Sequence, residues 1–292
     1  MPRKNSPILD LIPFLFVFLW STGFIAAKYA LPFVEPFYLL FIRMVLTVGI
    51  FLLLCIIFRV KWLSPRQAGH QMITGFLVHG AYLGGVFAAI KWGMPAGIAA
   101  IIVGIQPIMT AFFGYYFFKT SLYSRQLLGF GLGLVGVTTV LLSNGQQLNA
   151  PMAWPSVVAA LSALMGISLG TIYQKRFGTG ANLLAGLLWQ YVSAALLMGI
   201  LAWTFESCEV IWDRQLILAL GWLIFGLSIT AVLLLMYMIR EGEPAKVASY
   251  FYLVPPAAAI EAWILFDESL SLLGVGAIAV TVFGVYLVIR KP

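Results

Sequence analysis

Uninterrupted apolar runs dominate this chain, and several of them are about 20 residues long. A helix of about that length crosses the roughly 30 Å of hydrocarbon in a bilayer, and only helices and closed barrels satisfy their backbone groups there. The strict alternation of barrel strands is missing. With 62% hydrophobic and only 9% charged residues, the chain cannot fold in water without exposing a very large apolar surface. The sequence therefore predicts an all-α integral membrane protein.

We expect about ten transmembrane helices, which leave no room for a soluble domain. Each is an apolar run bounded by charged residues, Gly or Pro: Leu9–Ala27, Phe37–Phe58, Ile73–Ile90, Ala96–Phe118, Leu127–Leu142, Trp154–Tyr173, Leu183–Thr204, Leu216–Ile239, Val247–Phe266 and Leu272–Ile289.

The basic residues predict the orientation, because short basic loops stay on the cytoplasmic side. If the N-terminus is cytoplasmic, the outer connections hold only Lys28, Lys91 and Arg214, whereas the other loop and terminal cations all fall inside. Both termini are then cytoplasmic, and the first apolar run is a retained signal anchor. The net charge of +7 reflects this topology and gives no reason to expect a nucleic-acid partner.

The second half of the chain repeats the landmarks of the first at a shift of about 148 residues. Gly23 and Lys28 return as Gly170 and Lys175, and the segment Ile90–Pro95 returns as Ile239–Pro244. We therefore expect two units, residues 1–145 and 150–292. Five spans in each unit is an odd number, so the second unit enters the membrane inverted. Inverted repeats are typical of carriers that work by alternating access, although a duplicated channel or scaffold stays open as an alternative.

Three segments carry a resemblance to a known family. They are Leu19–Phe24 (LWSTGF) with the trailing Lys28, Pro36 with Arg43, and Ser249–Leu270 with its central prolines and closing acidic turn. Together they resemble the drug/metabolite transporter superfamily, specifically the EamA-type ten-helix permeases. The chain departs from the family at Thr120, the counterpart of Glu268, where the family often carries Glu.

This resemblance implies export of a small metabolite, often an amino acid or a nucleobase-like compound, out of a bacterial cytoplasm. The expected location is therefore the bacterial inner membrane, with the lipid bilayer and a small-molecule substrate as partners. A monomer and a homodimer both remain open.

Arg43 and Glu261 stand out because a charged side chain in hydrocarbon is costly unless it faces the bundle interior or a watered cavity. Arg43 lies some seven residues from Pro36, and Glu261 some six from Asp267, so both should lie at a similar depth from the outer face. They could form an outward gate. Alternatively, Arg43 could hold a substrate carboxylate while Glu261 accepts an amine or a coupling proton. A permanent ion pair, or an Arg43 that snorkels to the headgroups, is the structural alternative.

His79 lies near the middle of the third expected span, with Tyr82 one turn further on the same side. Such a His could carry a coupling proton or could be a hydrogen-bonded core residue. The other candidates for lining a binding or gating site present a ring or an amide from within a span: Trp20, Gln106, Gln190 and Tyr252. Gln106 and Tyr252 lie beside the expected helix breaks at Pro107, Pro255 and Pro256, where the missing backbone donors leave carbonyls free.

Other chemistries find little support in the sequence. Cys55 and Cys208 are expected at opposite faces, no metal-ligand cluster or phosphate loop is present, and no cofactor is implied. We therefore expect a transporter, not an enzyme, driven by a gradient or passive, with proton coupling left open. An integral-membrane enzyme acting on lipid-linked substrates, or a pore, is the alternative.

Overall fold

All regular structure that the computed structural model describes is helical. The described residues are 7–94, 99, 102–119, 123–143, 153–266 and 271–290, and within them the only sheet-like contact is an isolated antiparallel bridge between Val34 and Val210. The elements in chain order are α1 (Pro7–Ala30), α2 (Pro36–Ile57), α3 (Pro65–Gly75), η1 (Phe76–Ala81), α4 (Tyr82–Lys91), α6 (Gln106–Phe118), α7 (Ser124–Ser143), α8 (Trp154–Tyr173), η2 (Gln174–Gly178), α9 (Leu183–Phe205), α10 (Arg214–Trp222), η3 (Leu223–Ala231), α11 (Val232–Glu241), α12 (Pro244–Ser249), η4 (Tyr250–Leu253), α13 (Val254–Phe266) and α14 (Leu272–Ile289). The expected all-α fold is confirmed for these residues.

Several helices are suited to a bilayer. In the described part of the chain, six continuous helical segments are long and apolar enough to span a membrane: Pro36–Ile57, Pro65–Lys91, Trp154–Gly178, Leu183–Phe205, Arg214–Glu241 and Leu272–Ile289. Leu11–Gly23 is a shorter apolar helix. Large apolar side chains such as Ile56, Trp203 and Leu272 are exposed on the outside of the bundle, which fits contact with lipid.

Helix boundaries follow local capping signals. The third expected span, Ile73–Ile90, in fact begins earlier, at Pro65, because Ser64 forms a capping box: its hydroxyl accepts from the Gln67 N–H, and the Gln67 side chain accepts from the Ser64 N–H. Residues 96–98, 100 and 101 of the fourth expected span, Ala96–Phe118, lie outside the described residues, and the span continues as α6 from Gln106 onward.

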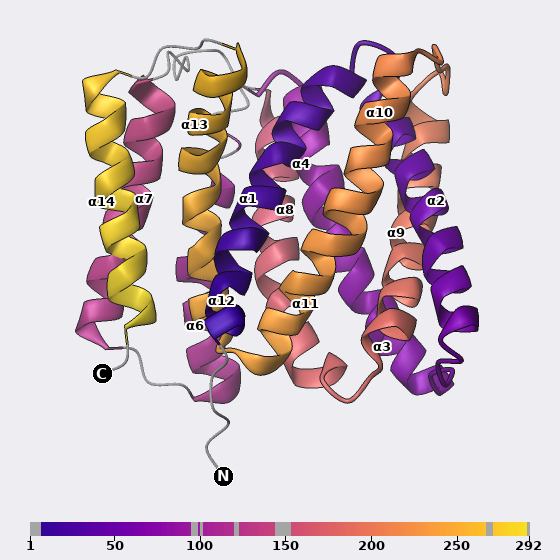
Figure 1. The fold of residues 1–292 in the computed structure, drawn as a ribbon, viewed down its shortest axis with the longest axis horizontal. Coiled ribbons are helices and arrows are strands. Elements are labelled where there is room, and N and C mark those ends of the chain that lie inside the picture. Colours follow the sequence, from indigo (N-terminus) through magenta and orange to yellow (C-terminus); the bar gives the residue numbers. More distant parts are fainter. Residues whose placement is uncertain are drawn as a thin grey trace.

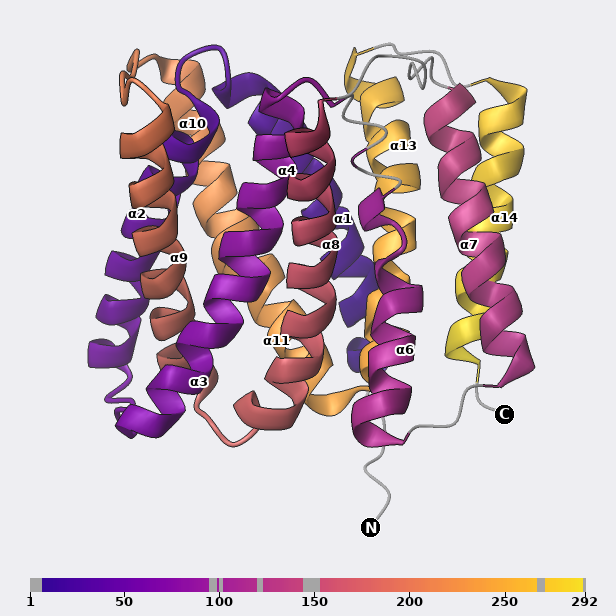
Figure 2. The same ribbon diagram turned by 180° about the vertical axis from the view of Figure 1, so that it is seen from behind.

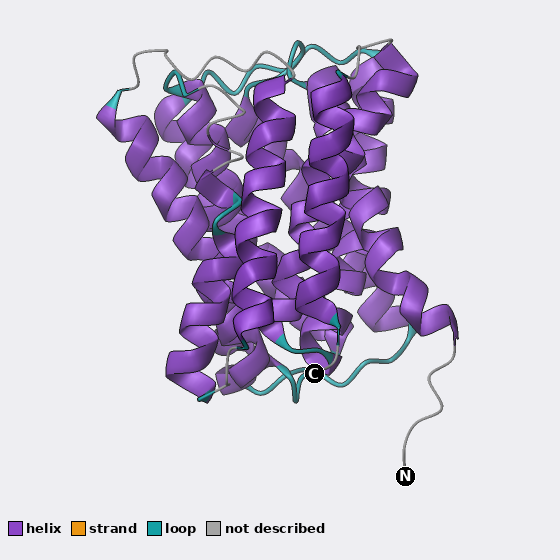
Figure 3. Cartoon of the chain, turned by 90° about the vertical axis from the view of Figure 1, so that its left-hand side faces the viewer, coloured by secondary structure: helices purple, strands orange, loops and turns teal. Residues whose placement is uncertain are grey.

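The helices stand side by side in an elongated bundle, with the connections gathered at its two ends (Figures 1 and 3). At one extreme of the long axis α7 packs along α14, and at the other α2 packs along α9. α1 begins and α14 ends at the lower end of the bundle in Figure 1. α1 rises from that end, whereas α8 descends toward it, as Figures 1 and 2 show.

The main helices follow the same order in the two halves of the chain. At shifts close to 148 residues, α1 corresponds to α8, α2 to α9, α3–η1–α4 to α10–η3–α11, α6 to α13, and α7 to α14. Even the irregular turns recur, because the π-helical η1 and η3 occupy the same place in the two halves. π-Helical turns leave backbone groups outside the regular i→i−4 pattern and occur often at functional sites.

Glycines allow the closest helix contacts. A Cβ on Gly75 of α3 would collide with the backbone of Gln190 in α9, and one on Gly129 of α7 would lie 2.6 Å from the Gly284 carbonyl in α14. These contacts let backbones approach where lipid gives no hydrophobic drive for helix association.

Candidate functional site

Arg43 is buried in the bundle without an acidic partner. Its side chain comes from α2 and is 7% exposed, and its Nε donates to the Ser228 hydroxyl at 2.8 Å. Ser228 belongs to η3, and its carbonyl accepts from the Tyr191 hydroxyl at 3.0 Å. Among the ion pairs between described residues, none includes Arg43. Its Nε thus binds a neutral hydroxyl, and an arginine keeps its charge even in a low-dielectric interior.

His79 connects this region to the lower half of the bundle. It lies in η1, is 2% exposed, and stacks on Tyr191 with ring centroids 4.6 Å apart. Its Nε2 lies 3.2 Å from Gln190 Oε1, while Gln190 Nε2 donates to Gln71 Oε1 at 2.6 Å and to Gln174 Oε1 at 3.4 Å. Because the Gln190 nitrogen is the donor in both contacts, its oxygen accepts, and the network assigns the hydrogen to His79 Nε2.

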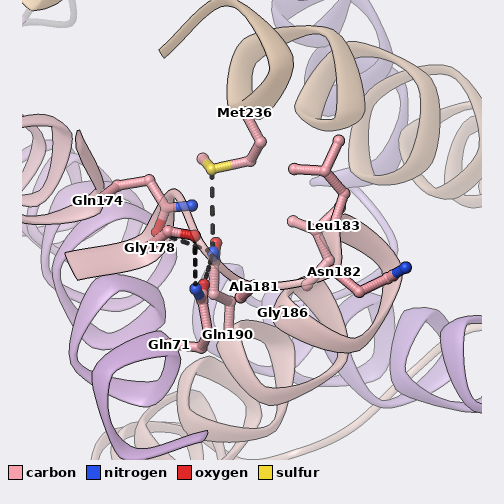
Figure 4. Close-up of a pocket in the computed structure, with 10 residues that line it drawn as sticks. Gln71, Gln174, Gly178, Ala181, Asn182, Leu183, Gly186, Gln190 and Met236 are labelled. Atoms are coloured by element: carbon pink, nitrogen blue, oxygen red, sulfur yellow. Dashed lines mark hydrogen bonds between the residues drawn. The ribbon is translucent and has the colours of Figure 1, made fainter. Parts of the chain in front are cut away.

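The amides of Gln71, Gln174 and Gln190 form one buried cluster. They line a narrow pocket, too tight to hold a water molecule, together with Gly178, Ala181, Asn182, Leu183, Gly186, Leu187 and Met236 (Figure 4). The dashed contacts in Figure 4 run among the lining residues themselves. The cluster thus joins α3, η2 and α9 by polar contacts that already have protein partners.

A second set of buried polar groups has no partner at all among the described residues. Both amide atoms of Gln106, the Thr110 hydroxyl and the Tyr252 hydroxyl make no hydrogen bond, and their side chains are no more than 1% exposed. Ser168 Oγ and Trp189 Nε1 are also unpartnered. An unsatisfied buried polar group costs about 1–3 kcal/mol, so it is kept only where something else meets it, such as water or a ligand.

These unpartnered groups lie beside two matching helix breaks. Gln106 and Pro107 open α6 directly after a turn at residues 104–105, and Thr110 follows on the same face one turn later. Tyr252 lies in the 3₁₀ turn η4, and Pro255 and Pro256 open the following α13. Each proline occupies the first turn of a new helix, where its missing N–H is not needed. Each helix that opens at these prolines thus follows a turn.

Glu261 has a partner different from that of Arg43. Its Oε1 accepts from the Ser21 hydroxyl of α1 at 2.5 Å, and its Oε2 has no partner among the described residues. Trp20, the neighbour of Ser21, packs against Phe16 and Phe251 with ring centroids 5.1 and 5.5 Å apart. The sequence places Arg43 and Glu261 at a similar depth in the membrane. It does not show whether the helix faces that carry them point toward each other.

The structure thus joins only part of the expected site. His79 contacts Gln190, Arg43 reaches the same network through Ser228 and Tyr191, and Tyr82 and Trp20 pack into the main core. Glu268, Thr120 and Asp267 lie outside the described residues. In the described part, no group of His, Cys, Asp and Glu could hold a metal ion, and Cys55 and Cys208 are free thiols.

Sequence reasoning missed several polar partners. Ser228 is a single hydroxyl in an apolar segment, where a serine is as often a small packing residue. Ser21 lies within the segment Leu19–Phe24 that carries the resemblance, but its residue type did not single it out as a partner of Glu261. Gln71 and Gln174 lie near helix ends and look solvated in the sequence. Thr110 could have been found, because it follows Gln106 by four residues and so shares its helix face.

The sequence profile of the EamA-like transporter family matches residues 8–142 and again residues 154–290. Among similar proteins is the "Uncharacterized inner membrane transporter YedA" of Escherichia coli (strain K12), 27% identical over 289 residues, which covers 98% of this chain and 92% of its relative. The "Probable amino-acid metabolite efflux pump" of the same strain is 26% identical over 283 residues (93% and 90%). The "S-adenosylmethionine/S-adenosylhomocysteine transporter" of Chlamydia muridarum is 24% identical over 277 residues (90% and 86%). A protein crystal structure with 19% identity matches 98% of this chain and 97% of its own with a TM-score of 0.81, and so has the same fold.

Proposed function

Since this chain belongs to the EamA-like transporter family, we propose that it is a secondary transporter that exports a small metabolite by alternating access. It is a multi-pass protein of a bacterial inner membrane. In this proposal ten helices form two inverted five-helix units, residues 1–145 and 150–292, with both termini in the cytoplasm. The matching element order and the opposite directions of α1 and α8 support the inversion.

The observation that carries the proposal is the set of unpartnered polar groups at the two helix breaks. Gln106, Thr110 and Tyr252 present donors and acceptors that no described residue satisfies. Broken helices at corresponding positions of inverted halves are where carriers of this kind bind substrate. We therefore place the substrate between the start of α6 and the turn η4.

The relatives guide the choice of substrate class. One bears a name for amino-acid metabolite efflux and another for transport of S-adenosylmethionine and S-adenosylhomocysteine. We propose an amino acid or nucleobase-like compound. Glu261 is the candidate for a coupling proton, because it is a half-buried carboxylate with one oxygen unpartnered.

Counterflow in liposomes tests the function. Purified protein is reconstituted and loaded with unlabelled amino acids, nucleobases or S-adenosylmethionine, and uptake of the labelled compound is followed with and without a pH gradient. A carrier gives saturable, transient accumulation of at least one compound. Flux that never accumulates or saturates indicates a pore instead, and silence across the panel overturns the proposed carrier.

The site has its own test, because removing an unpartnered polar group acts oppositely on stability and on binding. Thr110→Val and Gln106→Leu should leave the melting temperature unchanged or raise it, because each removes an unsatisfied group worth about 1–3 kcal/mol, while raising KM for counterflow about tenfold. Thr139→Val is the matched control, since the Thr139 hydroxyl already donates to the Val135 carbonyl at 2.8 Å. Unchanged KM in both site variants would remove these residues from the site.

A further inference from the structure

Among the described residues, ion pairs join the two halves of the chain at one end of the bundle. At the upper end in Figure 1, the α1–α2 connection and the end of α4, both from the first half, meet the α9–α10 connection from the second half. The backbone there is already linked: the Ile211 N–H donates to the Phe33 carbonyl at 2.9 Å beside the bridge between Val34 and Val210.

Lys91 and Glu206 form the centre of this contact. Lys91 Nζ lies 3.2 Å from Glu206 Oε1 and 3.5 Å from Glu35 Oε1. The Glu206 side chain is 0% exposed, and its two oxygens accept from the N–H groups of Phe37 and Tyr38 at 2.8 and 2.7 Å. These N–H groups open α2, so a carboxylate from the second half caps and neutralises the positive end of a first-half helix.

Glu35 makes the reverse connection, from the first half of the chain to the second. It is the N-cap residue of α2 but makes no cap hydrogen bond there. Its Oε2 instead accepts from the backbone N–H and the hydroxyl of Ser207 at 2.6 and 2.9 Å. Each half therefore supplies an acidic residue that binds backbone N–H groups of the other half. We call Glu35, Lys91, Glu206 and Ser207 the clasp.

The lower end is closed differently at the positions related by the repeat. Asn182, the counterpart of Glu35, caps its own helix α9 through the N–H groups of Leu184 and Ala185. Arg240, the counterpart of Lys91, pairs with its sequence neighbour Glu241 at 3.1 Å. Within the described residues, no ion pair crosses between the halves there. The contacts of cations across the halves there are hydrogen bonds to carbonyls instead: Arg125 donates to the Leu287 carbonyl and Arg176 to the Phe117 carbonyl. Among the described residues, ion pairs therefore join the halves at the upper end alone, so a change that breaks them acts on that end of a carrier whose two ends open in turn.

We propose that the clasp is the gate that closes the upper end, and that the central site opens toward that end only when Lys91 leaves Glu206. This inference rests on the proposed alternating access. Lys91 and Glu35 are 25% and 39% exposed, so water can replace their contacts when the ends separate. The buried Glu206 carboxylate must become exposed to water when the gate opens. When Lys91 leaves, the positive charge that balances this carboxylate is lost.

Cysteine labelling in intact cells tests the gate without any substrate. Thr110→Cys is introduced into a chain with Cys55→Ala and Cys208→Ser, so that a membrane-impermeant maleimide reports access from outside to the central site. Lys91→Met should speed labelling of this cysteine about tenfold, and Glu206→Gln less strongly. Lys91→Arg should retain slow labelling. The matched control is Arg214→Met, because Arg214 is a cation at the same end outside the ion pairs of the described residues.

Labelling of the native Cys208 distinguishes a gate, which controls access to the central site, from an ion pair that only holds two connections together. Cys208 is half-buried and lies two residues from Glu206, so its labelling reports opening of the clasp itself. Lys91→Met should speed labelling at both Cys208 and Thr110→Cys. Faster labelling at Cys208 alone, or no change at either position, overturns the gate. If the unmodified protein shows no counterflow, the proposed carrier function fails. The labelling rates still test the clasp, because they need no substrate. Melting temperatures show that each variant is folded.

Discussion

Gln190 is the residue at which the buried hydrogen bonds of the bundle converge, since it contacts His79, Gln71 and Gln174. Gln190→Leu would leave His79 Nε2 and Gln71 Oε1 buried without partners, at about 1–3 kcal/mol each. We expect a clear drop in melting temperature in detergent, the opposite of the effect of Gln106→Leu. Gln215→Leu, at an exposed amide, is the control. Equal stability of Gln190→Leu and the unmodified chain would contradict this network.

Glu35 predicts a pH dependence at the clasp. The Ser207 backbone N–H lowers the pKa of Glu35, and the Ser207 hydroxyl and Lys91 add to that effect. Because the folded pKa is the lower one, the stabilisation is present above the ordinary carboxyl pKa of about 4.3 and is lost as pH falls through the folded value. The difference in melting temperature between the unmodified chain and Glu35→Gln should therefore stay constant from neutral pH to about pH 5 and shrink in more acidic buffer. A difference that changes mainly between pH 6 and 8 would assign the effect to another group.

At the scale of the helix, hydropathy predicts where segments lie but not how they bend. The expected span Trp154–Tyr173 coincides with α8, and Leu272–Ile289 with α14, because apolar length and flanking polar residues set both ends. The π-helical turns η1 and η3 carry no comparable signal, since nothing in FLVHGA or LIFGLSITA differs from an ordinary apolar helix. Ser228 in η3 accepts from Arg43, a contact between distant segments that hydropathy does not describe. A proline restricts the backbone at its own position, so the turns before Pro107 and Pro255 could be expected from the sequence.

Substitution of two glycines of α3 should have opposite effects on stability, because only one of them lies against another helix. A Cβ on Gly75 would strike the Gln190 backbone, which cannot move aside as a side chain could, whereas a Cβ on Gly69 meets nothing within 4 Å. Gly75→Ala should force α3 and α9 apart and lose more than the 1–3 kcal/mol typical of overpacking. Gly69→Ala should stabilise by up to about 1 kcal/mol through helix propensity. Thermal unfolding of the pair checks this, and similar melting temperatures would refute the close approach of α3 and α9.

At the scale of the whole molecule, the candidate site could be predicted only in outline. The sequence singles out buried polar residues and helix breaks, because both are rare in apolar spans. It does not give the partner of each, since pairing depends on how the helices rotate about their axes. Arg43 and Glu261 illustrate this, with Ser228 and Ser21 as their separate partners. The clasp could not be predicted from the sequence, because its residues come from three segments that lie far apart along the chain.

The cation distribution over the two ends predicts the orientation. The connection between α2 and α3, the start of α7 and the connection between α11 and α12 lie at the lower end (Figure 1). The basic residues in or beside these segments are Arg59, Lys61, Arg66, Arg125, Arg240 and Lys246. Short basic connections stay in the cytoplasm, so the clasp should face outward. In intact cells an impermeant maleimide should label Cys208, although slowly. A cysteine at the exposed Ser124, introduced with Cys208→Ser, should react only after lysis. The reverse pattern would invert the molecule, and the clasp would then close the cytoplasmic end, so that its opening would admit a substrate for export and not release one.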